Sequence, residues 1–126
     1  MEKTVLLVDD DVVLRDILQD VLECEGYNVI PASDGHQALE FLRTSEGGAD
    51  EPALMILDLM MPLVNGWQVL DAIKEDRSLK KVPVIVLSAS GSLTASGPEP
   101  YEGVETTFLH KPFNLVELLN TVHARC

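Results

Sequence analysis

The sequence predicts an α/β fold, a doubly wound parallel sheet of five strands with helices on both faces. Strand-like apolar runs and helix-like periodic segments alternate about five times along the chain. Two of the runs, 53–57 and 84–87, contain no polar residue, which is typical of a central parallel strand covered on both faces. The chain has 126 residues, 46% of them hydrophobic, so we expect one domain, 1–126, with a packed core.

The first half of the chain predicts two strands and two helices. A strand is expected at residues 5–8, and a helix follows it because apolar residues then recur at helical spacing until Gly26, where the helix would stop. The apolar residues of this helix are Val13, Leu14, Ile17, Leu18, Val21 and Leu22. Residues 27–30 predict the second strand, and Ser33, Asp34 and Gly35 begin a second helix.

The second half predicts three strands, a third helix and a last helix. The strand at 53–57 ends at Asp58, and Asn65 is a good N-cap for the third helix. The strand at 84–87 ends at Ser88, and a strand around 107–110 precedes a helix that starts at Asn114. Between Ser88 and Thr106 a fourth helix is due, but three glycines and two prolines disfavour it, so we expect an irregular or shortened one.

The charge excludes several classes of function. There are 9 basic and 21 acidic residues, a net charge of −12, which argues against sequence-independent binding to nucleic acid or to an anionic membrane. No apolar run approaches the roughly 20 residues of a membrane span. Cys24 and Cys126 form no CxxC pair or metal-binding spacing, so we expect a reduced, cytoplasmic protein.

Polar residues follow the predicted strands at their carboxyl ends, where ligands bind in open parallel sheets. Asp9 and Asp10 follow the first strand, Asp58 the third, Ser88 the fourth and Lys111 the fifth. Three gathered carboxylates call for a hard divalent cation, Mg²⁺ or alternatively Mn²⁺. A hydroxyl and an ammonium group beside that cation suit a phosphoryl group, which the carboxylate of Asp58 could attack.

Acidic runs are also common at helix starts, and Asp11 fits that simpler interpretation. Asp9 and Asp10 alone would be evenly balanced between helix capping and metal binding. Their combination with Asp58, at the end of an apolar strand, favours metal binding.

Four motifs, in order and each at a strand end, carry a resemblance to a known family. They are Val8-Asp9-Asp10-Asp11, Asp58 to Pro62 with Gly66, Leu87-Ser88-Ala89, and Lys111-Pro112-Phe113. The chain resembles, from about Thr4 to about Arg125, the receiver domain of two-component response regulators, of the kind seen in chemotaxis response regulators. The resemblance implies a flavodoxin-like fold with strand order 2-1-3-4-5.

The resemblance also implies a role for each site residue. Asp58 would accept a phosphoryl group from the phosphohistidine of a sensor histidine kinase or phosphotransfer protein. Asp10 would bind Mg²⁺ directly, Asp9 would lie in the same pocket, and Asp58 and the backbone carbonyl of Met60 would complete the protein ligands. Ser88 would turn toward the phosphoryl group and Lys111 would pair with it.

A switch and a phosphoryl lifetime follow from the same resemblance. Phe108 would fill the space that Ser88 leaves on activation, although it lacks the hydroxyl of the more usual tyrosine. The residues two positions beyond the acceptor and the hydroxyl are Met60 and Ser90. Methionine cannot orient a water molecule by a hydrogen bond, so we expect slow self-dephosphorylation. The family's usual output surface includes the fourth helix, which is disfavoured here, so we expect the signal to pass through a different face or this segment to fold only when a partner binds.

Three interpretations of function compete. The first is a phosphoacceptor signalling module that changes its binding to a downstream protein or output domain, and that is no enzyme beyond transfer to its own Asp58 and slow hydrolysis there. The second is a degenerate receiver that docks proteins without phosphorylation. The third, a small phosphatase with an aspartyl nucleophile, is disfavoured because such enzymes place an Asp-x-Asp pair at the first strand.

Overall fold

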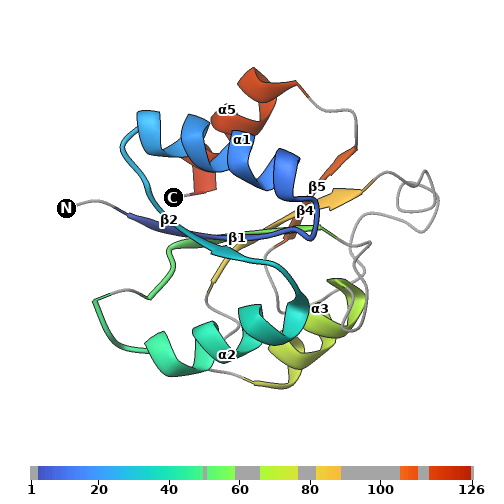
Figure 1. The fold of residues 1–126 in the computed structure, drawn as a ribbon. Coiled ribbons are helices and arrows are strands. Elements are labelled where there is room, and N and C mark those ends of the chain that lie inside the picture. Colours follow the sequence, from blue (N-terminus) through green and yellow to red (C-terminus); the bar gives the residue numbers. More distant parts are fainter. Residues whose placement is uncertain are drawn as a thin grey trace.

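The computed structural model describes residues 3–49, 51–58, 66–76, 82–88, 106–110 and 114–125. In these ranges five parallel strands form one sheet in the order β2-β1-β3-β4-β5, with four helices around it (Figure 1). The elements are β1 (Thr4–Val8), α1 (Val12–Cys24), β2 (Asn28–Ala32), α2 (Gly35–Ser45), β3 (Leu54–Asp58), α3 (Gly66–Glu75), β4 (Val84–Ser88), β5 (Thr106–His110) and α5 (Leu115–Arg125). The predicted fold class and strand order are confirmed. The expected irregular fourth helix falls in 89–105, outside the described residues.

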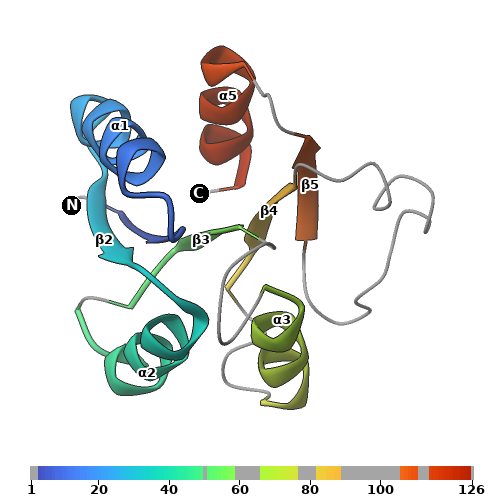
Figure 2. The same cartoon turned by 45° about the vertical axis from the view of Figure 1, so that its right-hand side comes forward.

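The sheet is the middle of three layers. Helices α1 and α5 cover one face and α2 and α3 cover the other, and the two pairs stay apart in both views (Figures 1 and 2). None of the described helices is long and apolar enough to cross a membrane.

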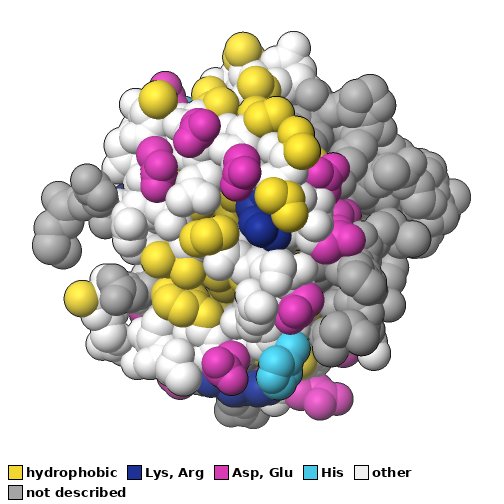
Figure 3. Space-filling model, in the orientation of Figure 1, with side chains coloured by type: hydrophobic (Ala, Val, Ile, Leu, Met, Phe, Trp, Pro, Cys, Tyr) yellow, Lys and Arg dark blue, Asp and Glu magenta, His cyan; other side chains and the backbone are white. Residues whose placement is uncertain are grey.

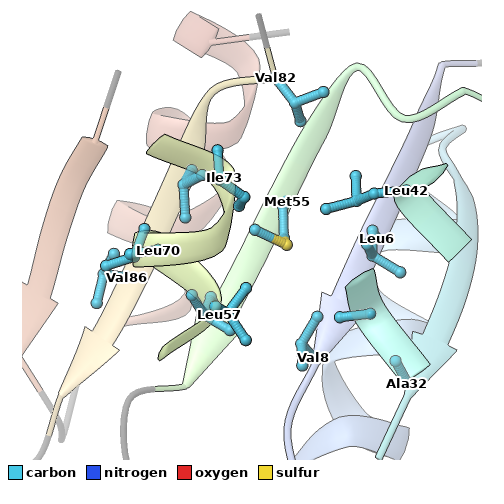
Figure 4. Packing of buried hydrophobic residues seen from close by; sticks show 13 residues of the cluster. Leu6, Val8, Ala32, Leu42, Met55, Leu57, Leu70, Ile73, Val82 and Val86 are labelled. Atoms are coloured by element: carbon cyan, nitrogen blue, oxygen red, sulfur yellow. The ribbon is translucent and has the colours of Figure 1, made fainter. Parts of the chain in front are cut away.

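Each face of the sheet has its own core. In β1, Leu6 and Val8 pack toward α2 and α3, while Val5 and Leu7 pack toward α1 and α5. This alternation follows from the two-residue repeat of a strand and explains why every residue of β1 is apolar or buried. Figure 4 shows the first of these cores, where Met55 of β3 lies between Leu6 of β1 and the helix residue Ile73. Burying each such side chain contributes about 1.5–3 kcal/mol, which holds the strand ends in place.

Two helices begin where the sequence predicted, at Asp34 and Asn114, while the predicted cap Asn65 lies outside the described residues. The side chain of Asp34 accepts a hydrogen bond from the amide of Gln37 at 2.9 Å, at the start of α2. Before α5, Oδ1 of Asn114 accepts one from the amide of Val116 at 2.7 Å. Asp11 is the N-cap of α1, consistent with its assignment to a helix start.

The end of α1 corrects the predicted second strand, which starts one residue later and ends two residues later than 27–30. Gly26 adopts a left-handed φ of 94°, and the amide of Tyr27 donates to the carbonyl of Leu22 at 3.1 Å. This is a Schellman cap, so Tyr27 belongs to the helix end and not to the strand. The strand continues through Pro31 because β2 is an edge strand, where a missing amide donor is tolerated.

The apolar stripe of α1 is only partly buried. Leu18 and Leu22 are fully buried, whereas Val13 and Ile17 are 69% and 47% exposed. The exposed large hydrophobic side chains of the described residues all belong to α1 and α5, and they are Val12, Val13, Ile17, Leu115 and Val116. Figure 3 shows apolar side chains among acidic ones over the upper part of the molecule, where Figure 1 places these helices.

A hydrogen-bonded chain joins α5 to the end of α1. The hydroxyl of Tyr27 lies 2.6 Å from Nδ1 of His123, and Nε2 of the same ring lies 3.1 Å from Oε1 of Glu25. The Tyr27 ring also packs against the core between the sheet and α1 and α5. The last turn of α5 is therefore tied to the α1–β2 connection by polar contacts as well as by buried leucines.

We expect Tyr27→Phe to lower the free energy of unfolding by about 0.5–1.5 kcal/mol, because it removes one hydrogen bond and keeps the ring. Urea denaturation measures this. The control is the same substitution in a His123→Ala background, where the loss should nearly vanish because the partner is absent. An equal loss in both backgrounds would show that the Tyr27–His123 contact contributes nothing.

Candidate metal centre

Three acidic side chains converge at the carboxyl edge of the sheet. Asp9 and Asp10 follow β1, and Asp58 is the last residue of β3. Each offers a carboxylate oxygen that lies within 4.8 Å of those of the other two. The predicted convergence of these three acids is confirmed. In the ranges that the structure describes, no second group of three or more His, Cys, Asp or Glu side chains has this arrangement.

The pairing of β1 with β3 brings the acids together. Val8 lies opposite Leu57 in the parallel register, so the next residues along the two strands are Asp9 and Asp58. A shift of one residue would turn Val8 and Leu57 away from the core that they share. The hydrophobic alternation of two central strands thus determines where the carboxylates meet.

The three carboxylates differ in their exposure to solvent. Asp9 is fully buried and Asp58 is 4% exposed, whereas Asp10 is exposed. Oδ1 of Asp9 accepts a hydrogen bond from the amide of Asp11 at 2.9 Å, and the amide of Asp9 donates to the carbonyl of Ala32 at 3.1 Å. Two acids are therefore built into the end of the sheet, and the third leaves the cluster open to water on one side.

This donor set fits a hard divalent cation. Two carboxylates about 4 Å apart repel each other by about 1 kcal/mol even in water, and by more in a buried site. A cation with oxygen ligands replaces that repulsion by attraction, and carboxylates are ligands of Mg²⁺ in proteins. The chain contributes three of them at one point, so the residues present fit the metal that the sequence predicted.

The other predicted site residues are located only in part. β3 pairs with β4 so that Asp58 lies opposite Leu87, which puts the backbone of Ser88 one residue further along the same edge. Ser88 in turn lies opposite His110, the residue before Lys111. The side chains of Ser88 and Phe108, and all of Met60 and Lys111, are outside the described residues, so their roles stay predictions.

Sequence reasoning missed one residue beside the cluster. Arg15, at the end of the first turn of α1, donates a hydrogen bond from Nη1 to the backbone carbonyl of Asp9 at 2.7 Å. The contact is to the main chain, which carries no side-chain signature in a sequence. The one signal available was an arginine one helical turn after the cap residue Asp11.

Comparison with known proteins agrees with this geometry. The chain matches the family described as "Response regulator receiver domain" over residues 5–123. It therefore belongs to the receiver domains of two-component response regulators, the family whose motifs it resembles.

Its relatives include transcriptional regulators. It is 42% identical to "Transcriptional regulatory protein CpxR" of Escherichia coli K12, over 95% of this chain and 47% of that protein. It is 37% identical to "Probable transcriptional regulator ycf29" of Pyropia yezoensis, over 98% of this chain and 53% of that one. The chain spans about half the length of these curated relatives.

Solved structures share the fold. The chemotaxis response regulator CheY4 of Vibrio cholerae matches with a TM-score of 0.84 and 28% identity, over 100% of both chains. The response regulator TrrA of Thermotoga maritima, solved in complex with Mg²⁺ and BeF, matches with a TM-score of 0.81 and 27% identity, over 98% of this chain and 99% of that one.

We expect Asp10→Asn to raise the free energy of unfolding by about 1 kcal/mol in EDTA, because it removes one charge from the repelling cluster. With saturating Mg²⁺ the order should reverse, since the native chain gains more from binding the cation. Thermal denaturation under both conditions measures this. Asp20→Asn, on an exposed position of α1, is the control and should respond equally in both. An Asp10→Asn variant less stable than the native chain in EDTA would contradict the repulsion.

Proposed function

We propose that this chain is the phosphoacceptor module of a two-component phosphorelay, and that Asp58 takes a phosphoryl group from the phosphohistidine of a kinase or phosphotransfer protein. The observation that carries the proposal is the meeting of Asp58 with Asp9 and Asp10, with their carboxylate oxygens within 4.8 Å. Family membership over residues 5–123 supports it, and we take the whole chain, 1–126, as one receiver domain.

The reaction transfers one phosphoryl group from a histidine nitrogen of the donor protein to the carboxylate of Asp58. A carboxylate oxygen of Asp58 attacks phosphorus, an O–P bond forms, and the P–N bond of the phosphohistidine breaks. The electron pair stays on the imidazole nitrogen, which takes up a proton from solvent. The product is an acyl phosphate on Asp58. Apart from this transfer and its hydrolysis, we propose no catalytic activity.

The neighbouring residues hold the charges of that reaction. Asp10, with Asp9 beside it, would bind Mg²⁺ together with Asp58 and the backbone carbonyl of Met60; Mn²⁺ has the same ligand preference. When bound, the cation supplies positive charge to the phosphoryl oxygens. Lys111 would pair with the phosphoryl group, Ser88 would donate its hydroxyl to it, and Phe108 would fill the space that Ser88 leaves.

The readout of phosphorylation is proposed to be a change in binding to a downstream protein or to an attached output domain. The relatives are transcriptional regulators of about twice this length, which supports an output segment beyond the receiver. The acidic character of the chain, net charge −12, argues against nucleic-acid or membrane binding by this part itself. A cytoplasmic location accords with that role.

Incubation with a small phosphodonor and Mg²⁺, followed by intact mass, tests the proposal. The native chain should gain one phosphoryl group, and Asp58→Asn should gain none because the nucleophile is lost. Omission of the cation with EDTA should abolish uptake by the native chain. If the native chain takes up nothing while it binds Mg²⁺, it is a degenerate receiver that docks proteins without phosphorylation.

We further expect a slow loss of the phosphoryl group, with a half-life of minutes or longer, because Met60 cannot orient an attacking water molecule. Met60→Asn should shorten the half-life, since an amide can hold that water by a hydrogen bond. Intact mass over time after removal of the phosphodonor measures both. Met55→Leu, in the buried third strand, is a matched control that should not change the rate. A native half-life of seconds would refute this idea.

A further inference from the structure

We infer that Arg15 is a positioning residue of the metal centre, which holds the backbone on both sides of Asp10 and so aims its carboxylate at the cation. The inference rests on the proposed Mg²⁺ site, and it adds a residue that the predicted site did not contain. Arg15 does not belong to the acidic cluster, and it acts through the main chain.

Two hydrogen bonds from Arg15 reach the residues that flank Asp10. Its Nη1 donates to the carbonyl of Asp9 at 2.7 Å, and its backbone amide donates to the carbonyl of Asp11 at 2.9 Å. The second is the ordinary first bond of α1, whereas the first spans six residues and is made by the side chain. One residue thus fixes the carbonyls before and after Asp10.

Two further hydrogen bonds hold residues 9–11, between β1 and α1, in place. The amide of Asp11 donates to Oδ1 of Asp9 at 2.9 Å, and Oδ1 of Asp11 accepts from the amide of Leu14 at 3.2 Å. Asp10 itself is exposed, so packing does not hold its side chain. Its direction therefore depends on the backbone on either side. Among the described residues of α1, Arg15 is the one whose side chain bonds to that backbone.

An arginine suits this task for two reasons. The guanidinium is planar and always charged, so its bond to a carbonyl is charge-assisted and directional. Arg15 is half-buried, so lost packing of its stem would also matter, and a variant should keep the stem and remove only the head group. Methionine meets that requirement and is a good helix former.

The positive charge of Arg15 lowers the affinity for Mg²⁺, whereas its positioning role raises that affinity. The two effects therefore predict opposite changes when the guanidinium is removed. A cation near the cluster repels Mg²⁺, so removal of the charge alone would tighten metal binding. Loss of positioning would weaken it. Removal of groups that orient metal ligands costs 10–100-fold in affinity, and a main-chain contact belongs at the lower end, about tenfold.

The experiment compares the full chain with Arg15→Met, Arg15→Lys and the control Arg43→Met, which removes an exposed charge at the end of α2. Melting temperature against Mg²⁺ concentration gives the dissociation constant of the metal alone. We expect Arg15→Met to bind Mg²⁺ about tenfold more weakly. Arg15→Lys, which keeps a charged donor, should fall between it and the native chain, and Arg43→Met should match the native chain.

A second readout separates positioning from general stability. The amide of Asp11 should exchange with solvent faster in Arg15→Met, while amides in α5 keep their native rates. Unchanged or tighter Mg²⁺ binding, with a melting temperature lowered equally with and without the metal, would overturn the inference and leave Arg15 a structural residue. If Arg15→Met fails to fold, Arg15→Lys decides, and native affinity in that variant overturns the inference.

Phosphoryl uptake distinguishes this inference from the proposed function. In Arg15→Met, uptake from a small phosphodonor should be slower at low Mg²⁺ and should recover at saturating Mg²⁺, because only the metal affinity has changed. A rate that stays low at saturating metal would overturn the positioning role. If the native chain takes up no phosphoryl group, the proposed function fails, and the Mg²⁺ titration still decides the role of Arg15.

Discussion

Mutual repulsion among three carboxylates is the constraint on which the rest of this structure depends. Asp9, Asp10 and Asp58 present oxygens within 4.8 Å of one another, and two of these side chains are buried. Such an arrangement persists only where the backbone is held by other forces. The two apolar cores supply them, because every residue of β1 and β3 is buried and each strand alternates its side chains between the two faces. Asp9 and Asp58 are therefore held by the centre of the sheet, whereas Asp10 is exposed and lies in the loop before α1.

The burial of β1 and β3 explains which elements of the molecule could be predicted from its sequence. The continuous apolar run before Asp58 indicates a central strand that is buried on both faces, so Asp58 was expected at the carboxyl end of that strand. Asp9 follows a similar apolar run. Local signals also predicted that helices begin at Asp34 and Asn114, and both side chains accept a hydrogen bond from the first turn of the helix that follows. Strand order had no such signal, because apolar patterns report burial and do not name the neighbouring strand. It came from the resemblance of the motifs, and the observed order agrees with it.

The strand bounds, the exposure of helix residues and the role of Arg15 depend on tertiary contacts that the sequence pattern does not show. Tyr27 was predicted as the first residue of the second strand, but its amide donates to Leu22 at the end of α1. The second strand continues past its predicted end at Ile30 through Pro31, because an edge strand tolerates the missing amide donor. Val13 and Ile17 fit the helical repeat of α1 and still face solvent, since apolar residues extend further around the helix than the face that the sheet can cover. Arg15 was missed because it binds a carbonyl, and every residue has one.

Charge balance explains why phosphorylation of Asp58 would change the conformation of the site and not only its covalent structure. With one Mg²⁺ bound, three ionised carboxylates would leave the site with a single net negative charge. An acyl phosphate replaces one carboxylate and carries a charge near −2, so the site becomes more negative by about one unit in a place where Asp9 is fully buried. Low-dielectric surroundings make that excess costly unless a cationic or hydroxyl group approaches. Ser88 is the last residue of β4, and His110, the residue before Lys111 in the sequence, is the last residue of β5. Under the proposed function, movement of Ser88 and Lys111 toward the phosphoryl group would relieve that excess. Asp9 and Asp58 are fixed by buried strands, so under the proposed function the response would come from the carboxyl ends of β4 and β5.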